Sequence, residues 1–253
     1  MRILITNDDG VHSEGIRVLT EAVRGMGETV VMAPAMEQSA SSHSITLRDP
    51  LLVDRLARNV YSVDGTPTDC VVLSLNGVIG ARPDLVVSGV NHGANMGDDV
   101  TYSGTVAAAI EAVLYGVPAI AFSVAALEGL LFEAPSRMIR PIVERMIARP
   151  RNPKTIWNVN FPNIPFGEVR GIRVTRLGTR FYENSVVEEA PRDGGKVFRI
   201  GGGKPTWKRE PETDFQAVFD RYVSITPILL DLNDYESILT MREWEWSREG
   251  GVK

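Results

Sequence analysis

Two hydrophobic patterns alternate along the first two thirds of the chain. Short, nearly unbroken apolar runs are typical of buried strands, whereas apolar residues three or four positions apart are typical of helices that face a core. Strands are predicted at residues 2–6, 29–33, 59–63, 84–90, 117–124 and 157–161, and helices at 16–26, 66–75, 103–116 and 134–149. Strands that alternate with helices form a parallel sheet covered by helices on both faces. The pattern therefore predicts an α/β fold with a doubly wound, mostly parallel sheet.

Beyond about residue 166 the pattern changes to that of extended antiparallel strands. The predicted elements are strands at 169–182, 196–200 and 222–228, the last broken at Pro227 and Asp231, a glycine turn at 201–203, and an amphipathic helix at 234–248 that carries Trp244 and Trp246. Such arms more often serve assembly than catalysis. We therefore expect an α/β catalytic core over 1–166 and a C-terminal extension over 167–253, a β-hairpin and helix used for oligomerisation. The alternative is a self-contained β lobe packed on its own core.

Composition narrows the class of protein. With 253 residues, 43% of them hydrophobic, the chain can bury a substantial core. No apolar run approaches the roughly 18 residues that a membrane span needs, and the start of the chain is unlike a signal peptide. The single cysteine, Cys70, is expected to be a buried apolar residue of a cytoplasmic protein. A net charge of −5 speaks against non-specific binding to duplex nucleic acid.

The first predicted strand ends in two adjacent acids, Asp8 and Asp9, followed by Gly10. In open α/β sheets, ligands bind at the carboxyl ends of the strands. Two neighbouring carboxylates raise each other's pKa unless a cation lies between them, and hard divalent cations prefer oxygen ligands. The two acids therefore indicate a metal site. The alternative is that one of them caps a helix through backbone N–H groups.

Three further polar segments are predicted at the same edge of the sheet. They are the serine-rich loop at 39–44, the segment Asn91–Gly97 after the strand at 84–90, and Ser103–Thr105 at the start of the long helix. Their candidate ligands are oxygen atoms, which favour Mg²⁺, Mn²⁺ or Ca²⁺. Zinc would need clustered histidines or cysteines, and the three histidines are scattered at positions 12, 43 and 92.

The start of the helix at 103–116 can bind an anion. The first backbone N–H groups of a helix lack partners within it, and the helix dipole places positive charge there. Hydroxyl groups of Ser103 and Thr105 flank this end, and Gly104 keeps the backbone accessible. Simple helix capping explains Ser103 equally well. A metal site beside an anion site nevertheless indicates that both hold a phosphate ester.

Related chemistries require residues that this chain lacks. A phosphatase of the haloacid-dehalogenase type needs a second aspartate two positions after the first, where Gly10 and Val11 stand. A response-regulator receiver needs an aspartate at the end of a central strand, and the strand at 84–90 ends in Asn91. The sequence also has no glycine-rich dinucleotide fingerprint, P-loop or nucleophile elbow. Chemistry with a metal-activated water is what remains.

Long motifs occur in a fixed order over nearly the whole chain. They are NDDG at 7–10, a serine-rich loop with Ser39 and HSIT at 43–46, GTPTDCV at 65–71, SGVNHGANMGDD at 88–99, YSGTVAAAIEA at 102–112 and YVSITPI at 222–228. Together they resemble the SurE (survival protein E) family. The resemblance implies a Rossmann-like α/β core with a C-terminal extension that builds homodimers or homotetramers. It also implies a divalent-metal-dependent 5′/3′-nucleotidase that hydrolyses nucleoside monophosphates, and in some members short polyphosphate.

The resemblance assigns roles to residues at the predicted edge. One divalent metal ion per subunit would be held by Asp8, Asp9, Ser39 and Asn91, the catalytic group would be Asp8, Asn95, Ser103, Gly104 and Thr105, and the substrate would contact Ser39, His43, Ser44, Asn95 and residues 103–105. The general acid is open: His43 and His92 are candidates, although a loop histidine without a catalytic task explains each. Where the family often has glycine, this chain has Ser42, which can alter the loop.

Two other functions use similar residues. A non-catalytic nucleotide- or metal-binding regulatory protein would have the same pocket, because binding and hydrolysis share their ligands. A nucleotide-sugar transferase on a similar sheet would also need an acceptor site, for which the sequence offers no candidate residues. Turnover of nucleotides separates the first alternative from an enzyme.

Overall fold

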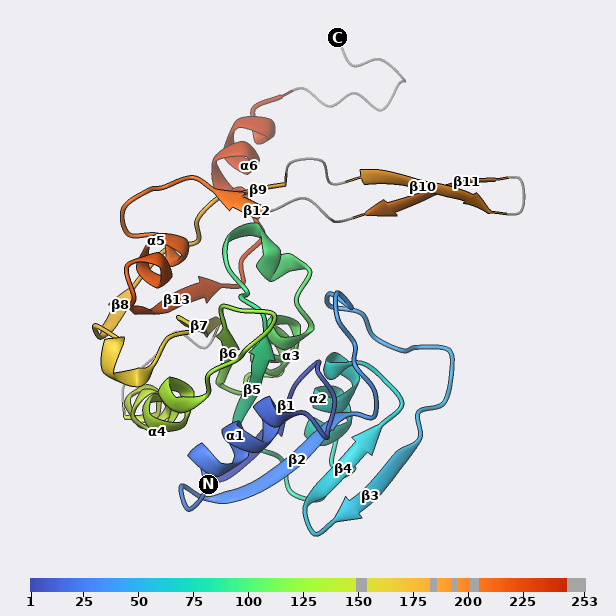
Figure 1. The fold of residues 1–253 in the computed structure, drawn as a ribbon. Coiled ribbons are helices and arrows are strands. Elements are labelled where there is room, and N and C mark those ends of the chain that lie inside the picture. The colour runs from blue at the N-terminus through green and yellow to red at the C-terminus, as the bar shows by residue number, and fades with distance from the viewer. Residues whose placement is uncertain (149–153, 183–185, 193–194, 201–204, 245–253) are drawn as a thin grey trace.

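A computed structural model describes residues 1–148, 154–182, 186–192, 195–200 and 205–244. Its centre is a nine-stranded sheet with the strand order β3-β4-β2-β1-β5-β6-β7-β13-β8 (Figure 1). These strands are β1 (Arg2–Thr6), β2 (Glu28–Pro34), β3 (Val53–Ala57), β4 (Val60–Val63), β5 (Leu85–His92), β6 (Ala119–Val124), β7 (Thr155–Phe161), β8 (Ile172–Val174) and β13 (Val223–Leu229). Neighbours from β4 through β7 are parallel, β3 and β13 run antiparallel to them, and β8 is parallel to β13. The predicted α/β fold is confirmed.

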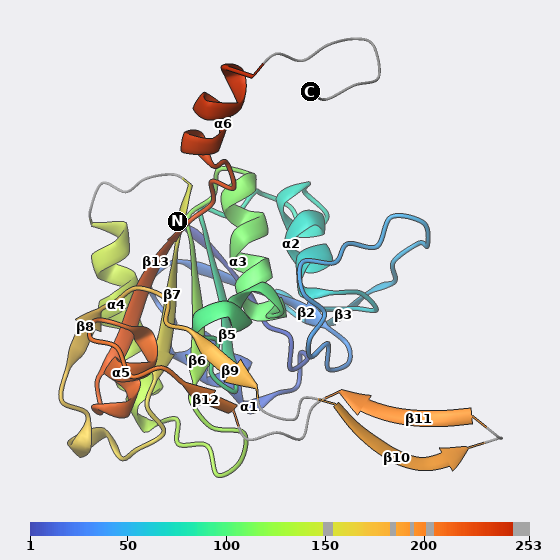
Figure 2. The same ribbon diagram turned by 90° about the horizontal axis from the view of Figure 1, so that it is seen from above.

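Helices cover both faces of the sheet. They are α1 (Glu14–Ala22), α2 (Pro67–Leu75), α3 (Gly104–Leu114), α4 (Glu133–Ile147) and α5 (Asp214–Phe219), with 3₁₀ turns η1 (Gly97–Thr101) and η2 (Phe166–Glu168). Side chains alternate between the faces of a strand. On β1, Ile3 and Ile5 join the core that includes residues of α1 and α4, whereas Leu4 joins the core that includes residues of α2 and α3. The two pairs of helices lie on opposite faces of the sheet (Figure 2). Each face thus has its own buried apolar layer.

The chain reverses its direction of travel across the sheet between β1 and β5. From β1 it adds β2 and β4 on one side, and then β5, β6 and β7 on the other. This reversal leaves a crevice at the carboxyl ends of β1 and β5, which is the usual ligand site of such sheets. The segments predicted to carry the chemistry follow these two strands.

Elements from beyond residue 166 are divided between the central sheet and projections from it. β8 and β13 belong to the central sheet, β9 (Arg180–Tyr182) pairs with β12 (Pro205–Trp207), and β10 (Val186–Arg192) pairs with β11 (Gly195–Ile200). The β10–β11 hairpin and α6 (Tyr235–Arg242) extend away from the sheet (Figures 1 and 2). The expected glycine turn at 201–203 and the helix residues after 244 lie outside the described residues. Use of this extension for oligomerisation stays a prediction.

β13 continues through Pro227, where the sequence predicted a break. β8 pairs with β13 only up to Ile225, and on that side Val223 N–H donates to the Gly171 carbonyl while Thr175 N–H donates to the Ile225 carbonyl. Alternate residues of a strand direct their backbone groups to the same side, so the Pro227 nitrogen faces the side that β8 leaves open. A proline there removes no hydrogen bond of the sheet.

Other elements carry weak sequence signals. β3 has the sequence VDRLA and is mostly exposed, so it lacks the apolar run of a buried strand. α5 contains only six residues, too few for a clear helical period. Within the described residues, no helix has both the length and the apolar character that crossing a membrane requires.

Candidate active site at the β1–β5 crevice

The turn after β1 is built by buried polar contacts. Asn7 is fully buried, and its Nδ2 donates to the Gly10 carbonyl at 3.0 Å and to Ser13 Oγ at 2.8 Å. Ser13 in turn caps α1 by accepting from Ile16 N–H at 3.3 Å. Gly10 has a φ of 92°, which favours glycine over residues with a side chain. Asp8 and Asp9 are therefore held at the end of β1 by the chain that connects it to α1.

Asp8 is bound to the first turn of α3. Its Oδ2 accepts the backbone N–H of Thr105 at 3.1 Å, and its Oδ1 accepts the Thr105 hydroxyl. Gly104 makes this approach possible, because a Cβ there would lie 3.0 Å from Asp8 Cβ and 2.8 Å from Ser41 Oγ. The structure thus brings Asp8, Gly104 and Thr105 together, as the sequence predicted. We call this group and Ser41 the Asp8–Gly104 corner.

Asp9 lies beside β5. Its Oδ2 accepts the backbone N–H of His92 at 3.2 Å, and its Oδ1 is 3.7 Å from His92 Nδ1. The His92 ring also lies against Phe132, with 6.0 Å between ring centroids. His92, a candidate general acid from the sequence, is therefore placed next to one predicted metal ligand.

Both acids hold their protons more tightly than exposed aspartates. Burial raises the pKa of Asp8, and the hydrogen bonds from Thr105 oppose this effect. Burial, followed by the neighbouring charge of Asp8, raises the pKa of Asp9 to about 6. Each cause disfavours the carboxylate form. A cation placed between the two groups would favour that form, so the electrostatics of the pair suit a metal ion.

The serine-rich loop crosses from β2 to the start of α3. Gln38 N–H donates to the Asp8 carbonyl at 2.7 Å, while Ser42 donates from its N–H to Tyr102 at 3.1 Å and from its Oγ to Thr101 at 2.7 Å. Ser42 has a φ of 54°, in the left-handed region that favours glycine. The serine at this position therefore keeps a backbone conformation that a glycine would adopt more easily.

The hydroxyl groups of this loop have different surroundings. Ser39 is exposed, and its Oγ donates to Glu37 Oε1 at 2.5 Å. Ser41 Oγ is buried without a hydrogen-bond partner among the described residues and faces Gly104. The sequence did not single out Ser41. In a run of serines the sequence does not show which hydroxyl is buried, so it could not distinguish Ser41 from its neighbours.

His43 and Ser44, the other predicted contacts from this loop, bond within the protein. His43 Nε2 lies 2.7 Å from Glu111 Oε2 on α3, and Ser44 Oγ donates to the Ser41 carbonyl at 2.7 Å. Glu111 is largely buried and was not singled out from the sequence. The His43–Glu111 pair anchors the loop to α3, and so fixes where its serines lie.

The loop after β5 is held by a network of side-chain amides. Asn95 Nδ2 donates to Ser123 Oγ at 2.8 Å, and Asn95 N–H donates to Asn160 Oδ1 at 2.9 Å. The Asn95 carbonyl accepts from Asn158 at 2.7 Å and from Asn160 at 2.9 Å. Sequence reasoning found Asn95 but missed its three partners. The signal was present, because two asparagines at alternate positions of a buried strand face the same side.

A buried carboxylate ties η1 to the extension. Asp214 has no exposed surface and accepts the backbone N–H groups of Gly97 at 2.8 Å, Gly178 at 2.9 Å and Phe215 at 2.8 Å. Its Oδ2 therefore fixes the end of the loop that follows β5 and carries Asn95. Nothing in the sequence around Asp214 marks this role.

Comparison with known proteins identifies the family. The family model described as survival protein SurE matches residues 3–184. The chain belongs to the SurE family. It is 46% identical over 248 residues to a protein named 5′-nucleotidase SurE from Gemmatimonas aurantiaca, covering 96% of this chain and 98% of that one. A protein of the same name from Vibrio cholerae is 44% identical over 245 residues, covering 96% and 97%.

A solved structure agrees with this assignment. The crystal structure of SurE protein from Aquifex aeolicus is 39% identical in sequence and superimposes with a TM-score of 0.86, covering 96% of this chain and 98% of that one. The likeness extends over the C-terminal elements as well as the sheet. The SurE fold is therefore shared over nearly the full length of the chain.

The predicted metal ligands of this SurE family member suit a hard cation. Among the described residues, no three His, Cys, Asp or Glu side chains gather as a metal site, and the predicted set has two carboxylates with neutral oxygens from Ser39 and Asn91. Asn91 Nδ2 donates to the Gly93 carbonyl at 2.8 Å, which leaves its amide oxygen as the atom able to bind a cation. All four groups offer oxygen, the donor that Mg²⁺, Mn²⁺ and Ca²⁺ prefer.

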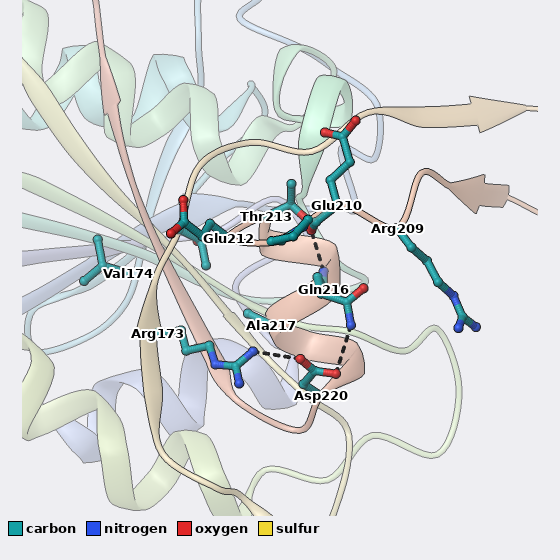
Figure 3. Close-up of a pocket in the computed structure, with 11 residues that line it drawn as sticks. Arg173, Val174, Arg209, Glu210, Glu212, Thr213, Gln216, Ala217 and Asp220 are labelled. Carbon is teal, nitrogen blue, oxygen red and sulfur yellow. Dashed lines mark hydrogen bonds and ion pairs between the residues drawn. The ribbon is translucent and has the colours of Figure 1, made fainter.

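A cavity lies at the edge of the sheet that β8 forms. It has a volume of about 610 Å³ and lies between β8, α5 and the segment before α5 (Figure 3). Two of its charged groups are paired with each other: Arg173 binds Asp220 at 2.7 Å. Gln216 also donates to Asp220, at 2.9 Å. The predicted site residues belong to other elements, so this cavity is separate from the candidate active site.

Proposed function

We propose that this chain is a divalent-metal-dependent phosphatase that hydrolyses nucleoside 5′- and 3′-monophosphates. The observation that carries the proposal is the contact between Asp8 and the first turn of α3, where Thr105 donates to both carboxylate oxygens. It supports an anion site at this helix end, close to one of the two acids. The relatives named 5′-nucleotidase SurE support nucleotides as substrates. Short-chain polyphosphate is a further candidate substrate, because it offers the same phosphate group to the same residues.

We assign the metal ligands to Asp8, Asp9, Ser39 and Asn91. A divalent cation held there supplies positive charge that polarises a phosphate and lowers the pKa of water. The raised pKa values of the two aspartates support this assignment, because a cation relieves the cost of ionising both.

The protein's own groups then bind and orient the phosphate. In the first turn of α3, Thr105 N–H is bonded to Asp8 and Val106 N–H is bonded to Ser103 Oγ, which leaves Gly104 N–H as the donor not engaged by the described residues. The helix dipole favours an anion at this point. Gly104 N–H and the Ser103 and Ser41 hydroxyls can donate to phosphate oxygens.

Asn95, in the loop after β5, has a fixed backbone position. Its carbonyl and N–H are held by Asn158 and Asn160. Its side chain is oriented before a substrate binds, because Nδ2 donates one hydrogen to Ser123 Oγ at 2.8 Å, which leaves the second hydrogen for a substrate. Donors that are fixed in advance stabilise charge that develops in the transition state, typically by about 3 kcal/mol for one donor. We assign Asn95 and Ser103 this role.

The test is release of inorganic phosphate by chelator-stripped protein. The substrates are nucleoside 5′- and 3′-monophosphates and short-chain polyphosphate, each with and without added Mg²⁺, Mn²⁺ or Ca²⁺. Metal-dependent release from the monophosphates supports the proposal. Nucleotide binding without release, by folded protein with metal present, would indicate a regulatory binding protein instead.

We further propose that the chain assembles into homodimers or homotetramers through residues 167–253. Four apolar side chains of the β10–β11 hairpin are exposed in the single chain: Val186, Val187, Phe198 and Ile200. A hairpin of two strands is marginal by itself in water, and contact with another chain would stabilise it. Light scattering on the purified protein measures the assembly, and a monomer at micromolar concentration would contradict it.

A further inference from the structure

The edge strand β8 is only partly covered on its outer side. β8 is the last strand of the central sheet, and among the described residues it pairs only with β13. Just beyond β8, Arg176 donates its N–H to the Glu212 carbonyl at 2.9 Å and accepts the Asp214 N–H at 3.0 Å. The segment around Thr213 is therefore a short parallel partner of the chain that follows β8.

Pro211 and Glu212 end this partner segment before it can pair with β8 itself. Proline has no N–H to donate to a neighbouring strand. Glu212 has a φ of 63°, in the left-handed region that strands do not use. The chain turns away here and leaves the cavity of about 610 Å³ that lies between β8 and residues 209–220 (Figure 3). We call this cavity the β8 groove.

Backbone groups of β8 face the groove. Thr175 N–H donates to the Ile225 carbonyl on the β13 side, whereas Arg176 bonds to the segment on the outer side. Successive residues of a strand direct their backbone groups to opposite sides, so Ile172 and Val174 direct theirs outward. The side chains of Ile172 and Val174 are 45% and 75% exposed. An open edge of this kind is a template for another strand.

The two edges of the central sheet are protected to different degrees. Charged side chains on an edge strand oppose the addition of a further strand. The other edge strand, β3, exposes both Asp54 and Arg55. β8 has a single charged residue, Arg173, whose guanidinium group is bound to Asp220 at 2.7 Å. The β8 edge is therefore the more suitable of the two for binding another strand.

Cations outnumber carboxylates around the groove. Glu210 binds two of them, Arg176 at 2.9 Å and Lys208 at 2.5 Å. The hydrogen bond from Lys208, followed by that from Arg176, lowers the pKa of Glu210. Asp220 likewise binds Arg173, and the charge of Arg170 adds to the effect that holds the pKa of Asp220 below its ordinary value.

The remaining charges leave this surface positive. Glu212 and Arg209 form no ion pair within the described residues, and the Arg209 guanidinium lies 4.7 Å from the centre of the Phe219 ring. Arg209 lies across α5 from Arg173 (Figure 3). Five cationic side chains and three carboxylates give a surplus of two positive charges, in a chain whose net charge is −5. A negatively charged partner therefore suits the groove.

We propose that the β8 groove binds an extended acidic segment of a partner protein as an additional strand of the central sheet. Hydrogen bonds to the outward backbone groups of Ile172 and Val174 supply affinity, as in other cases where a peptide joins a sheet edge. Arg170 and Arg209 select acidic side chains. The interaction is independent of the proposed phosphatase activity, because the groove and the candidate active site are built from different elements.

The experiment measures the binding of fluorescently labelled peptides to the full chain by anisotropy. The peptides alternate valine with glutamate, lysine or glutamine. We expect the glutamate peptide to bind at least about tenfold more tightly than the lysine peptide, because like charges placed together across an interface are costly. Methylation of all its backbone nitrogens, which removes the N–H donors of the added strand, should abolish binding.

Val174→Pro tests the backbone contact. The outward N–H is lost, but no hydrogen bond to β13 is lost with it. One hydrogen bond contributes about 1 kcal/mol, so the affinity for the glutamate peptide should fall about fivefold. Val174→Thr keeps the N–H and the branched shape and is the matched control. In the wild-type protein, the peptide should also slow hydrogen exchange at the Val174 N–H.

Arg209→Glu tests the charge. This variant should bind the lysine peptide more tightly than the glutamate peptide, which reverses the preference of the wild-type protein. Arg58→Glu is the matched control, because Arg58 is exposed beside β3 at the other edge of the sheet. It should keep the wild-type preference.

Three results would overturn the proposal. They are equal binding of the glutamate and lysine peptides, failure of every peptide to bind folded protein, and unchanged affinity in Val174→Pro protein that has the wild-type melting temperature. A lower assembly mass of Val174→Pro in light scattering would show that the groove pairs copies of this chain, which overturns it as well. Binding is measured without turnover, so a failure of the phosphatase function leaves this test intact.

Discussion

Thr105 donates hydrogen bonds to both oxygens of the Asp8 carboxylate, one from its backbone N–H at 3.1 Å and one from its hydroxyl. The two residues are 97 positions apart in the chain. The contact joins the end of β1 to the start of α3, so the acid and the helix end are positioned as one unit. A change on either side should therefore affect the same step of the reaction.

Asp8→Asn should abolish turnover and preserve the fold. The amide is neutral and cannot supply the negative charge that a divalent cation needs, so we expect phosphate release to fall at least 100-fold. Removing a buried charge whose pKa is already raised should not lower the melting temperature of the metal-free protein. Asp98→Asn is the control, since Asp98 is exposed. A full rate in Asp8→Asn would exclude Asp8 as a metal ligand.

Thr105→Val tests the hydroxyl alone. Valine keeps the branched shape and the backbone N–H but cannot donate from its side chain to Asp8. A hydrogen bond to a charged group contributes about 1.5–3 kcal/mol, so kcat should fall by about ten- to a hundredfold. Thr105→Ser retains the hydroxyl and should keep most of the activity. Equal rates for the two variants would show that the hydroxyl does not position Asp8.

The pKa of Asp9 makes the stability of the metal-free protein depend on pH. Because the folded-state pKa of about 6 exceeds the ordinary value of 3.8, the folded protein binds more protons between these values. The free energy of unfolding should therefore fall as pH rises from about 4 to about 6, by on the order of 3 kcal/mol. Asp9→Asn should remove this slope. Urea unfolding with a chelator across this pH range measures it.

Above pH 6, bound metal should restore the stability that the metal-free protein loses when Asp9 ionises. The cation binds the ionised form of Asp9 and competes with the proton, so metal affinity should fall as pH drops through about 6. The rise in melting temperature caused by Mg²⁺ should accordingly be larger at pH 8 than at pH 5. A rise of equal size at both values would exclude Asp9 from the metal site.

Much of the fold follows from local patterns in the sequence. Buried strands such as β1 and β6 read as apolar runs because both of their faces contact helices. Asp8 and Asp9 could be identified from the sequence because two adjacent acids at the end of a buried strand repel each other unless a cation lies between them. β3 could not be found, since an exposed edge strand has no such run. The strand β13 was located, but its continuation through Pro227 depends on where β8 ends.

The supporting residues of the site depend on tertiary pairing. Asn158 and Asn160 reach Asn95 because β7 lies beside β6 in a particular register. Asp214 reaches Gly97 from a position 117 residues away. The alternating asparagines mark one face of β7, but no local pattern shows which loop they meet, and none marks Asp214. Only the assembled sheet brings these residues together with their partners. The sequence therefore indicates the acids that carry the chemistry more readily than the residues that hold them.

Ser39 and Ser41 should have separable roles. Ser39→Ala removes a proposed metal ligand. The Mg²⁺ concentration for half-maximal activity should rise by at least about tenfold, because losing even a group that only supports a ligand typically costs about 10–100-fold. Ser41→Ala removes a buried hydroxyl that faces the Asp8–Gly104 corner. It should raise the inhibition constant of inorganic phosphate and leave the Mg²⁺ requirement unchanged. The opposite assignment of effects would make Ser41 the ligand.

Asp214→Ala should destabilise the protein and weaken catalysis together. The change leaves the N–H groups of Gly97, Gly178 and Phe215 buried without their acceptor. Each lost partner costs about 1–3 kcal/mol, so we expect a loss of roughly 3–5 kcal/mol in the free energy of unfolding. Because Gly97 ends the loop that carries Asn95, kcat should also fall in protein that remains folded.

Two matched variants separate this anchor from a general effect of removing an acid near α5. Asp214→Asn keeps one acceptor oxygen and should recover part of both losses. Asp220→Ala removes a partly exposed acid from the end of the same helix, where its ion pair with Arg173 is open to solvent and contributes little to stability. Urea unfolding and phosphate release measure both properties on each protein. If Asp214→Ala and Asp220→Ala lose equal stability, Asp214 does not anchor the loop, and another contact must hold Asn95 in place.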